Sequence, residues 1–304
     1  MATGDLHLSV HLGQRWTAAT LTVHGRMWTV TFDGQTRIPS GVSIDPDTGA
    51  VLVAAAGLAT ATTHPDTYLP DPVTALRSSG DPDPQPAAAV SALLAHVANT
   101  ASAQAGIAVS TLTVTTPQPW GPKSRQRLIL AATTAGLPEP AIVTAAAAAA
   151  SATQSSQPAQ GRFVLVCTIG DDYPDIAVLD ITEQYTQLAA TTVRDAEAPG
   201  IQHALAESIR HRSGDTKGSS ELDWRTAAEI DRARTTLSRT SRAPILLPDN
   251  ASPVVLDTAD LYKAAQPHFD QLGPALTQVF NDADIDPTDL ASTVLVAYDL
   301  AGSS

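Results

Sequence analysis

Three short segments at the start of the chain alternate apolar and polar residues. They cover residues 6–12, 17–23 and 27–32, and turn-forming residues separate them. Strict alternation is typical of strands that bury one face. The pattern therefore predicts a three-stranded antiparallel meander. Residues 34–67 that follow are rich in turn formers, and we expect loops there with one short strand at 51–53.

The pattern changes to helical spacing after a cluster of prolines at Pro82, Pro84 and Pro86. Because proline lacks a backbone donor and restricts the residue before it, we expect a helix to begin only after this cluster. Apolar residues at helical spacing predict that helix over 87–105, with Gly106 as its stop. The later elements of this half form an α/β layer. They are a strand at 111–115, a helix at 123–135, a short strand and an alanine-rich helix at 141–152.

Residues 154–161 (QSSQPAQG) are small, polar and unable to contribute to a core. This composition predicts a boundary between a first lobe, 1–157, and a second lobe, 158–304. After the boundary the order of elements repeats, with a meander first and helices afterwards, which indicates a duplicated fold. The repeated strands are expected at 162–168, 174–181 and 185–193, and the helices at 201–211 and 224–238.

Composition narrows the classes of partner. The net charge of −13 argues against nucleic acid, whose binding depends on Lys and Arg that neutralise phosphates. The single cysteine, Cys167, lies in an apolar run and is expected to be a small buried residue. The N-terminus lacks the pattern of a secretory signal, which favours a cytoplasmic protein. The apolar segment at 141–152 is shorter than a membrane-spanning helix, so membrane contact is expected only through a region outside this chain.

Four segments, in order, resemble the nucleotide-binding domain of the Hsp70 chaperones, which belongs to the actin and sugar-kinase superfamily. The resemblance implies a two-lobed actin/Hsp70-like α/β fold made of duplicated RNase H-like halves. The turn Pro-Gln-Pro-Trp-Gly-Pro at 117–122 also resembles Hsp70-like proteins encoded with mycobacterial type VII secretion systems, which implies an actinobacterial context. The four segments are residues 32–65 (with IPSG at 38–41), 111–151, 230–248 (with IDRARTTLS at 230–238) and 276–298.

The first phosphate loop of the family reads Asp-Leu-Gly-Thr-Thr and corresponds here to residues 11–15, HLGQR. Gly13 is kept, so the hairpin can still turn. The acid that positions the hydration shell of magnesium is replaced by His11. The two hydroxyl residues are replaced by Gln14 and Arg15. The resemblance thus implies a degenerate first loop.

The second phosphate loop, Asp-Leu-Gly-Gly-Gly-Thr-Phe-Asp in the family, begins here at Thr168 and keeps Gly170 and Asp175. Asp171 and Asp172 replace glycines whose backbone would approach the phosphates. Two like charges 4 Å apart repel by about 1 kcal/mol in water and by about 4 kcal/mol at an effective dielectric near 20. Two alternatives remain: bound magnesium could use these carboxylates as ligands, or the carboxylates, with Asp175, could form an acid–base pair. We favour a solvated turn over the acid–base pair.

Further positions of the family's site are partly kept. Arg77 matches the basic residue near the γ-phosphate, and the alternative is an ordinary surface arginine. Asp231, Arg234 and Ser238 keep the character of the Glu, Lys and Ser that hold adenosine. They lie three and four residues apart on one helix face. They could bind a nucleoside, but we favour a solvated ion pair between residues three apart.

Two other features are candidates for sites. His7 and His11 share a strand face without a carboxylate or thiol at metal-ligand spacing, so no metal is expected there. Trp120 is either an exposed anchor for a partner or a turn residue packed on Leu128.

The sequence predicts a degenerate Hsp70-like protein without a cofactor, acting as a noncatalytic protein-binding or chaperone-like factor, with type VII secretion as its context. The alternative is a functional chaperone ATPase that binds ATP with Mg²⁺. A third hypothesis is that only a nucleoside binds. Family members continue with a helix after the strand STVLVAY, whereas this sequence stops at Ser304. Either the natural protein is short, or a truncated C-terminal region carried substrate binding or a membrane anchor.

Overall fold

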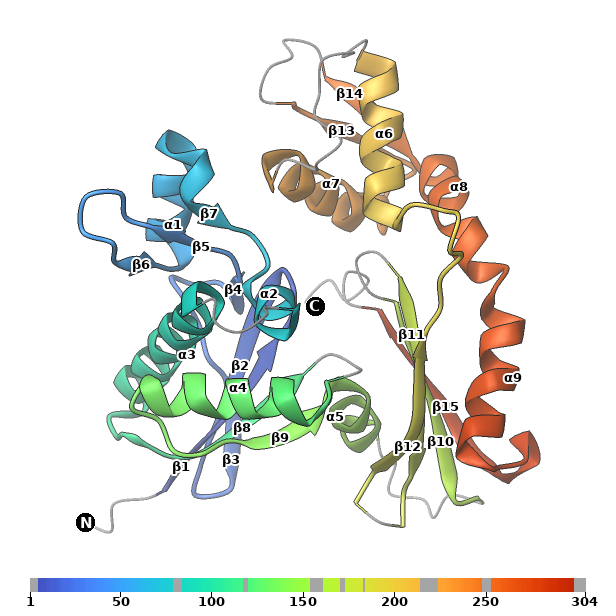
Figure 1. Cartoon of the computed structure of the whole chain (residues 1–304), viewed down its shortest axis with the longest axis horizontal. Coiled ribbons are helices and arrows are strands. Elements are labelled where there is room, and N and C mark those ends of the chain that lie inside the picture. The colour runs from blue at the N-terminus through green and yellow to red at the C-terminus, as the bar shows by residue number, and fades with distance from the viewer. Residues whose placement is uncertain are drawn as a thin grey trace. The chain divides into compact units, whose positions relative to one another are not determined.

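The computed structural model describes residues 5–78, 84–116, 120–153, 161–169, 173–182, 184–213, 224–247 and 253–297. The chain divides into two compact units, Met1–Ala148 and Ala149–Ser304, and each is described by itself (Figure 1). The boundary expected between residues 157 and 158 lies outside the described residues and stays a prediction. Among the described residues, no helix combines the length and the apolar character needed to cross a bilayer.

The first unit is built around a mixed sheet with strand order β3-β2-β1-β8-β9, in which β4 also pairs with β2. The β1, β2 and β3 strands are antiparallel, as the alternation predicts. The β8 strand joins the other edge of β1 in parallel, and β9 continues in parallel. The strands are β1 (Leu6–Leu12), β2 (Trp16–Val23), β3 (Arg26–Thr29), β4 (Arg37–Pro39), β8 (Val109–Thr116) and β9 (Ala141–Thr144).

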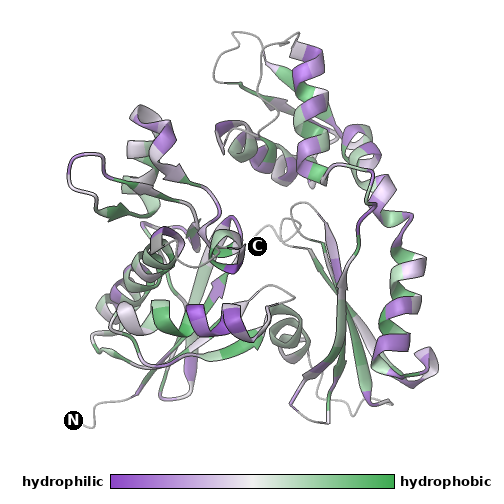
Figure 2. Ribbon diagram, in the orientation of Figure 1, coloured by the Kyte–Doolittle hydropathy of each residue, from purple (hydrophilic) through white to green (hydrophobic). Residues whose placement is uncertain are grey.

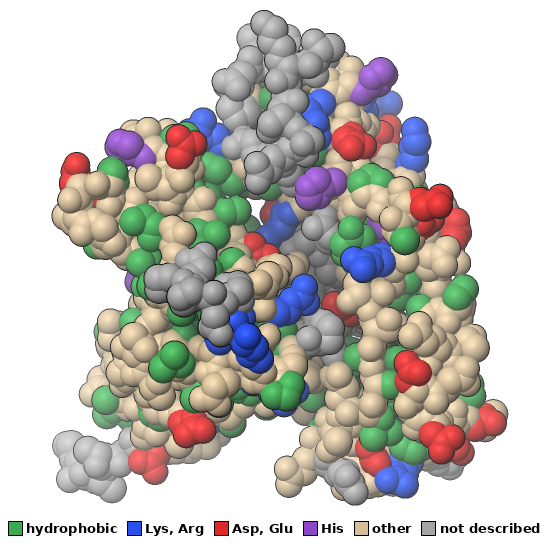
Figure 3. Space-filling view, viewed as in Figure 1, with side chains coloured by type: hydrophobic (Ala, Val, Ile, Leu, Met, Phe, Trp, Pro, Cys, Tyr) green, Lys and Arg blue, Asp and Glu red, His purple; other side chains and the backbone are tan. Residues whose placement is uncertain are grey.

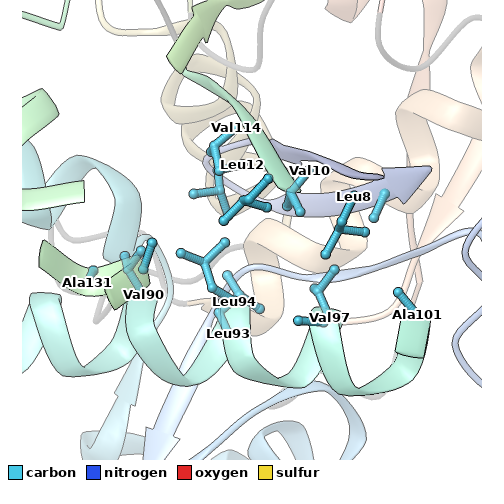
Figure 4. Packing of buried hydrophobic residues seen from close by; sticks show 14 of the residues in the cluster. Leu8, Val10, Leu12, Val90, Leu93, Leu94, Val97, Ala101, Val114 and Ala131 are labelled. Atoms are coloured by element: carbon cyan, nitrogen blue, oxygen red, sulfur yellow. The ribbon is translucent and has the colours of Figure 1, made fainter. Parts of the chain in front are cut away.

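One face of this sheet carries the hydrophobic core of the first unit. The alternation places Leu8, Val10 and Leu12 on that face, and Val114 of β8 joins them. Helix α3 (Pro84–Ala105) lies across the face and contributes Val90, Leu93, Leu94 and Val97 (Figure 4). Helices α2 (Pro72–Ser78) and α4 (Pro122–Thr134) complete the same cluster with Val73, Leu76, Leu128, Ala131 and Ala132.

The pattern of the sequence was wrong at two places in this unit. Helix α3 begins at Pro84, inside the proline cluster, because a proline in the first turn of a helix loses no intrahelical hydrogen bond. The region expected to be loops contains helix α1 (Ala54–Thr63), whose many alanines favour a helix without giving it a clear apolar stripe. The small elements around it are β5 (Val42–Ile44), β6 (Val51–Leu52), the 3₁₀ turn η1 (Pro65–Thr67) and β7 (Tyr68–Leu69).

Helix α5 (Ala145–Ala152) crosses the division between the units, and the second unit then repeats the plan of the first sheet. Its sheet has the order β12-β11-β10-β15. The first three strands are antiparallel, and β15 pairs with β10 in parallel. This order confirms the predicted second meander. The strands are β10 (Phe163–Ile169), β11 (Pro174–Asp180), β12 (Thr186–Thr192) and β15 (Leu290–Ala297).

The duplication extends to a detail of strand pairing. In the first sheet, the register between β1 and β8 shifts between Leu6 and His7. In the second sheet, the register between β10 and β15 shifts between Phe163 and Val164, again after the first residue of the strand. The two sheets can therefore be superposed residue by residue from this shift, and the fold is a duplicated α/β fold as predicted.

The rest of the second unit is mainly helical. Residues between 201 and 269 form a hydrophobic cluster of their own, whereas helix α9 joins the cluster of the second sheet. Helix α9 packs on β11 and β12 and, like α6, carries both hydrophobic and hydrophilic residues along its length (Figure 2). Helix α8 begins with a capping box made by Asp257 and Asp260. The elements are α6 (Ile201–Ser213), α7 (Trp224–Leu237), β13 (Arg242–Ile245), β14 (Val254–Asp257), α8 (Thr258–Phe269), α9 (Leu272–Ala283) and the 3₁₀ turn η2 (Pro287–Asp289).

Candidate functional site

Each unit has its own candidate site at the hairpin that follows the same strand of its sheet, β1–β2 in the first unit and β10–β11 in the second. Counted from the register shift, His11 and Thr168 hold equivalent positions. His11 pairs with Ala18 of β2 and with Thr115 of β8. Thr168 pairs with Asp175 of β11 and with Val296 of β15. Neither equivalent position carries an acid.

Gly13 makes the close turn of the first hairpin possible. Its backbone N–H donates to the carbonyl oxygen of Trp16 at 3.1 Å. A Cβ atom at this position would lie 2.6 Å from that same oxygen, closer than real side chains approach. The hairpin therefore keeps the backbone approach that a glycine permits.

A buried hydroxyl network braces the first hairpin from the side of β4. The Ser40 hydroxyl donates to the Gly13 carbonyl at 2.8 Å and lies 2.8 Å from the Thr17 hydroxyl. The Ser40 backbone N–H donates to the Arg15 carbonyl at 2.7 Å. Ser40 and Thr17 are fully buried. Sequence analysis placed Ser40 only within the IPSG segment at 38–41. It missed Thr17, although the alternation of β2 places this residue on the buried side of the strand.

The side chains of the first loop are engaged with their own unit. The His11 Nδ1 atom lies 2.8 Å from the Thr115 hydroxyl. Burial lowers the pKa of His11, so the imidazole is neutral at pH 7. The Gln14 amide donates to the hydroxyl of Thr74 on α2 at 2.9 Å. A neutral imidazole and an amide thus stand where the family has an acid and hydroxyls.

His7 continues the polar face of β1. Its Nδ1 lies 2.7 Å from the Thr111 hydroxyl, and its Nε2 lies 3.2 Å from Ser9 and 3.3 Å from Thr113. The imidazoles of β1 thus contact a row of threonine hydroxyls on the neighbouring strand β8. Over the part of the chain that the structure describes, no group of three or more His, Cys, Asp or Glu residues is placed to hold a metal.

The second hairpin is described up to its tip. Asp175 accepts a hydrogen bond from the Thr192 hydroxyl at 2.6 Å, so its carboxylate is tied to β12. Tyr173 meets the ring of His268 edge to face, with centroids 5.1 Å apart. Gly170, Asp171 and Asp172 lie outside the described residues. The proposed repulsion of phosphates by Asp171 and Asp172 therefore stays a prediction.

Arg77 lies exposed in the last turn of α2. Its carbonyl oxygen, and that of Leu76, accept from the Arg127 guanidinium of α4 at 3.3 Å and 3.1 Å. The structure therefore shows that this end of α2 contacts α4. The contact of the Arg77 side chain with a phosphate stays a prediction.

The predicted nucleoside residues share one side of α7 but differ in exposure. Asp231 is 7% exposed, and Ser238 lies just past the end of the helix, where its hydroxyl donates to the Thr235 carbonyl at 2.8 Å. The expectation of a solvated carboxylate is wrong for Asp231, because this side chain is buried, and its pairing with Arg234 stays a prediction. Another pair of residues three apart on α7, Glu229 and Arg232, forms an ion pair at 2.7 Å.

The structure decides the open question of Trp120 and corrects the expectation for Cys167. Trp120 is 6% exposed and belongs to the same core cluster as Leu128, so it is a packed residue and the exposed anchor is wrong. Cys167 is only partly buried. It faces the apolar side of the second sheet, next to Leu295 of β15 in the strand register, and burial raises the pKa of its thiol.

At the two equivalent positions the side chains differ from those that a magnesium–nucleotide complex needs. Magnesium prefers oxygen ligands in a near-octahedral shell and is bound in such sites through carboxylates and phosphates. At the two equivalent positions the chain offers a neutral imidazole and a hydroxyl, His11 and Thr168. The hairpin backbone would suit a phosphate, but these side chains do not fit the hydrated metal.

Two duplicated sheets, each with a hairpin after its central strand, define the class of nucleotide-binding fold to which the chain conforms. The family model described as Hsp70 protein matches residues 71–298, well over half of the chain. The chain therefore belongs to the Hsp70 family. A search of curated proteins found no match. Membership indicates a nucleotide-binding, chaperone-like function, and Hsp70 domains typically bind ATP together with Mg²⁺.

Proposed function

We propose that this chain is a noncatalytic member of the Hsp70 family that acts as a chaperone-like accessory factor by binding protein partners. The observation that carries the proposal is the loss of the acid at both equivalent positions. His11 stands in one sheet and Thr168 in the other. Losing one acid would weaken a magnesium site, whereas losing both leaves neither of these two positions with a carboxylate for the metal's water shell.

The contacts of His11 support this proposal. A histidine cannot replace a carboxylate in positioning the metal's water shell, because it brings no negative charge. Here Nδ1 lies against the Thr115 hydroxyl within the sheet, and burial disfavours the charged form of the ring. The Gln14 amide is directed to Thr74, so it too brings no carboxylate to the hairpin.

The proposed partners are proteins, in keeping with the acidic charge of −13, which disfavours nucleic acid. Type VII secretion in an actinobacterial cytoplasm is the proposed context, and it rests on the turn motif at 117–122. Because Trp120 is buried in the core, this turn supports the proposal as a feature of the family and not as a docking surface. A membrane would be reached only through a region outside this chain.

Isothermal titration calorimetry with Mg-ATP, Mg-ADP and adenosine tests the proposal. We expect no saturable binding of either nucleotide below about 1 mM, which corresponds to less than about 4 kcal/mol of binding free energy. A control titration with the His11→Asp and Thr168→Asp double variant asks whether restoring both acids restores affinity. A low-micromolar constant for the unmodified chain would contradict the proposal.

A working ATP-dependent chaperone is the second candidate, and the preserved first hairpin favours it. Gly13 still permits the close backbone approach, and Ser40 still braces the turn. In this case Mg-ATP binds with a low-micromolar constant that is lost when Asp171 and Asp172 are replaced by asparagine. If only a nucleoside binds, through Asp231, Arg234 and Ser238, adenosine and ATP should give equal constants.

A further inference from the structure

The β3 strand forms one edge of the first sheet among the described residues (Figure 1). It runs antiparallel to β2 and closes a hairpin whose two turn residues, His24 and Gly25, both have positive φ. Turns of this kind fix the register of a hairpin. The side of β3 that faces away from β2 is therefore a defined row of backbone groups.

The backbone groups of this segment point alternately toward β2 and away from it. Val30, just past the end of β3, donates its N–H to the carbonyl of Ala19 on β2 at 2.8 Å. Because the direction alternates along an antiparallel strand, the N–H and carbonyl of Trp28 also point toward β2. Those of Met27 and Thr29 point away, where they are placed to bond a further strand.

Thr31 shows how this outward side is bonded by a partner. Its N–H donates to Oε1 of Gln104 on α3 at 3.3 Å, and the Gln104 amide nitrogen donates to the Thr31 carbonyl. One side-chain amide thus makes the two bonds that a residue of a neighbouring strand would make. At Met27 and Thr29, among the described residues, no strand pairs with this side of β3, and all four residues of β3 are exposed.

Two exposed apolar side chains lie beside these backbone groups. Met27 is 71% exposed and Trp28 is 42% exposed, on opposite faces of the strand because neighbouring residues alternate. Single exposed apolar side chains are ordinary on a protein surface, and Figure 3 shows them scattered over one face of this molecule. Leu130 on α4 is an example, but its backbone lies in a helix. Only on β3 do we find such side chains together with an outward row of strand backbone groups in the part of the first unit that the structure describes.

Charge narrows the kind of strand that fits this edge. The two strands that pair with this side of β2 are β3 (RMWT) and β4 (RIP), and they carry Arg26 and Arg37 without a carboxylate. A strand with an acidic residue opposite Arg26 would gain a favourable cross-strand pair. A second copy of this chain is disfavoured, because it would bring its own Arg26 to the same edge and a second net charge of −13.

We propose that the outer edge of β3 is a docking site for an extended segment of a partner protein, which adds to the first sheet as one more strand. Its backbone would bond to Met27 and Thr29, as in other complexes formed by strand addition. Its side chains would be apolar against Met27 and Trp28 and acidic opposite Arg26. Because β3 has only four residues, these side-chain contacts contribute to the affinity along with the backbone bonds. The inference rests on the proposed function and names the chemistry of the partner.

A short designed peptide, acetyl-Ser-Thr-Phe-Val-Glu-Ser-amide, is the probe. Antiparallel to β3, it places its Thr, Phe, Val and Glu opposite Thr29, Trp28, Met27 and Arg26. We would label the peptide with fluorescein and follow its anisotropy as the full chain is added. Saturable binding with a dissociation constant of about 100 µM or lower is expected. Added salt should weaken this binding, because one of the contacts is an exposed charge pair.

Matched peptides test the backbone bonds and the charge separately. A peptide with Pro in place of Val lacks the N–H that would bond to the Met27 carbonyl and should show no saturable binding. A peptide with Lys in place of Glu should bind about fivefold more weakly, because two like charges would then lie opposite each other.

Variants of the chain test the same edge from the other side. Thr29→Pro removes one outward N–H and keeps the bonds to β2, since proline is tolerated where the N–H of an edge strand faces solvent. Met27→Lys replaces an apolar contact by a charge of the kind that blocks strand edges. Each variant should weaken peptide binding by about tenfold or more. Leu130→Lys, at an exposed apolar residue of α4, should leave it unchanged, and circular dichroism checks that all three variants fold.

Three results would overturn the docking site. The first is no saturable binding of the peptide at ~1 mM chain. The second is undiminished binding to both Thr29→Pro and Met27→Lys. The third is a dimer of the chain, seen by sedimentation velocity without peptide and lost in Thr29→Pro, which would assign the edge to a second copy. Failure of the peptide alongside absent Mg-ATP binding removes the docking site and leaves the proposed function standing. ATP turnover would remove the proposed function whatever the peptide does.

Discussion

The two sheets of this chain share strand order, pairing and even the position of a register shift, but they differ in how their apolar faces are covered. In the first sheet α3 and α4 close the core over Val114. In the second α9 covers β11 and β12, and Leu295 at the equivalent position is exposed. The two sheets therefore share their strand pairing, whereas the helices that cover them and the residues at their hairpins differ.

The two hairpins also differ from the family pattern in their side chains, although the shape of the first turn is kept. Gly13 preserves the shape of the first turn because a side chain there would meet a backbone oxygen. The two equivalent positions, where the family resemblance implies an acid, hold His11 and Thr168. The shape of the first turn is kept where packing requires it, and the loss of metal binding at these two positions is our proposal.

The largest expected difference between the sheets is at Val114 and Leu295. Val114→Asp would bury an unpaired carboxylate and should cost more than about 4 kcal/mol of unfolding free energy. Leu295→Asp should change it by no more than about 0.5 kcal/mol, because the site is exposed. Urea denaturation followed by circular dichroism measures both. Equal costs at the two positions would show that the second sheet is covered as fully as the first.

A smaller effect is expected at the glycine of the first hairpin. Gly13→Ala forces the backbone around Trp16 to move and should destabilise the chain by about 1–3 kcal/mol. The matched control is Gly121→Ala, where a Cβ atom meets nothing within 4 Å, and which should be close to neutral. Thermal denaturation of both variants gives the comparison. A neutral Gly13→Ala would mean that the turn is not held by close packing.

The smallest expected effect is on the pH dependence of stability, to which His11 contributes and its equivalent, Thr168, does not. Burial lowers the pKa of His11 in the folded chain, so the unfolded chain binds a proton first as the pH falls. Its contribution to stability is present above about pH 6.5 and is lost below it, by at most about 1.4 kcal/mol per pH unit. His11→Thr, which copies Thr168, should flatten this dependence between pH 7.5 and 5.5.

The control for this pH dependence is already in the chain. Burial also lowers the pKa of His96, but His96 is present in both proteins, so the difference between their stability curves isolates His11. Chemical denaturation at several pH values supplies the curves. Parallel curves for the two proteins would show that His11 titrates as freely in the folded chain as in the unfolded one.

Much of the fold could be predicted from the sequence because alternation and helical spacing record which face is buried. Both meanders and the helix ending at Ala105 were found in this way. Helix α1 was missed by the pattern because alanine favours a helix without marking a side. The start of α3 was misplaced because proline is tolerated in a first turn.

The candidate site could be predicted only in part. Motif positions such as His11 and Gly13 follow from the sequence, since the family pattern fixes their order. The bond from Ser40 to Gly13 and the contact of His11 with Thr115 join segments far apart in the chain, and no local pattern reveals them. The exposure of Leu295 was equally hidden, because an apolar residue in a strand is expected to be buried.

ATP hydrolysis by the purified chain separates a noncatalytic protein from a working ATPase. We expect phosphate release with ATP and Mg²⁺ to equal release without the metal and release from ATP alone. The His11→Asp and Thr168→Asp double variant, assayed in parallel, tests whether restoring both acids restores hydrolysis. Steady, magnesium-dependent turnover by the unmodified chain would contradict the account.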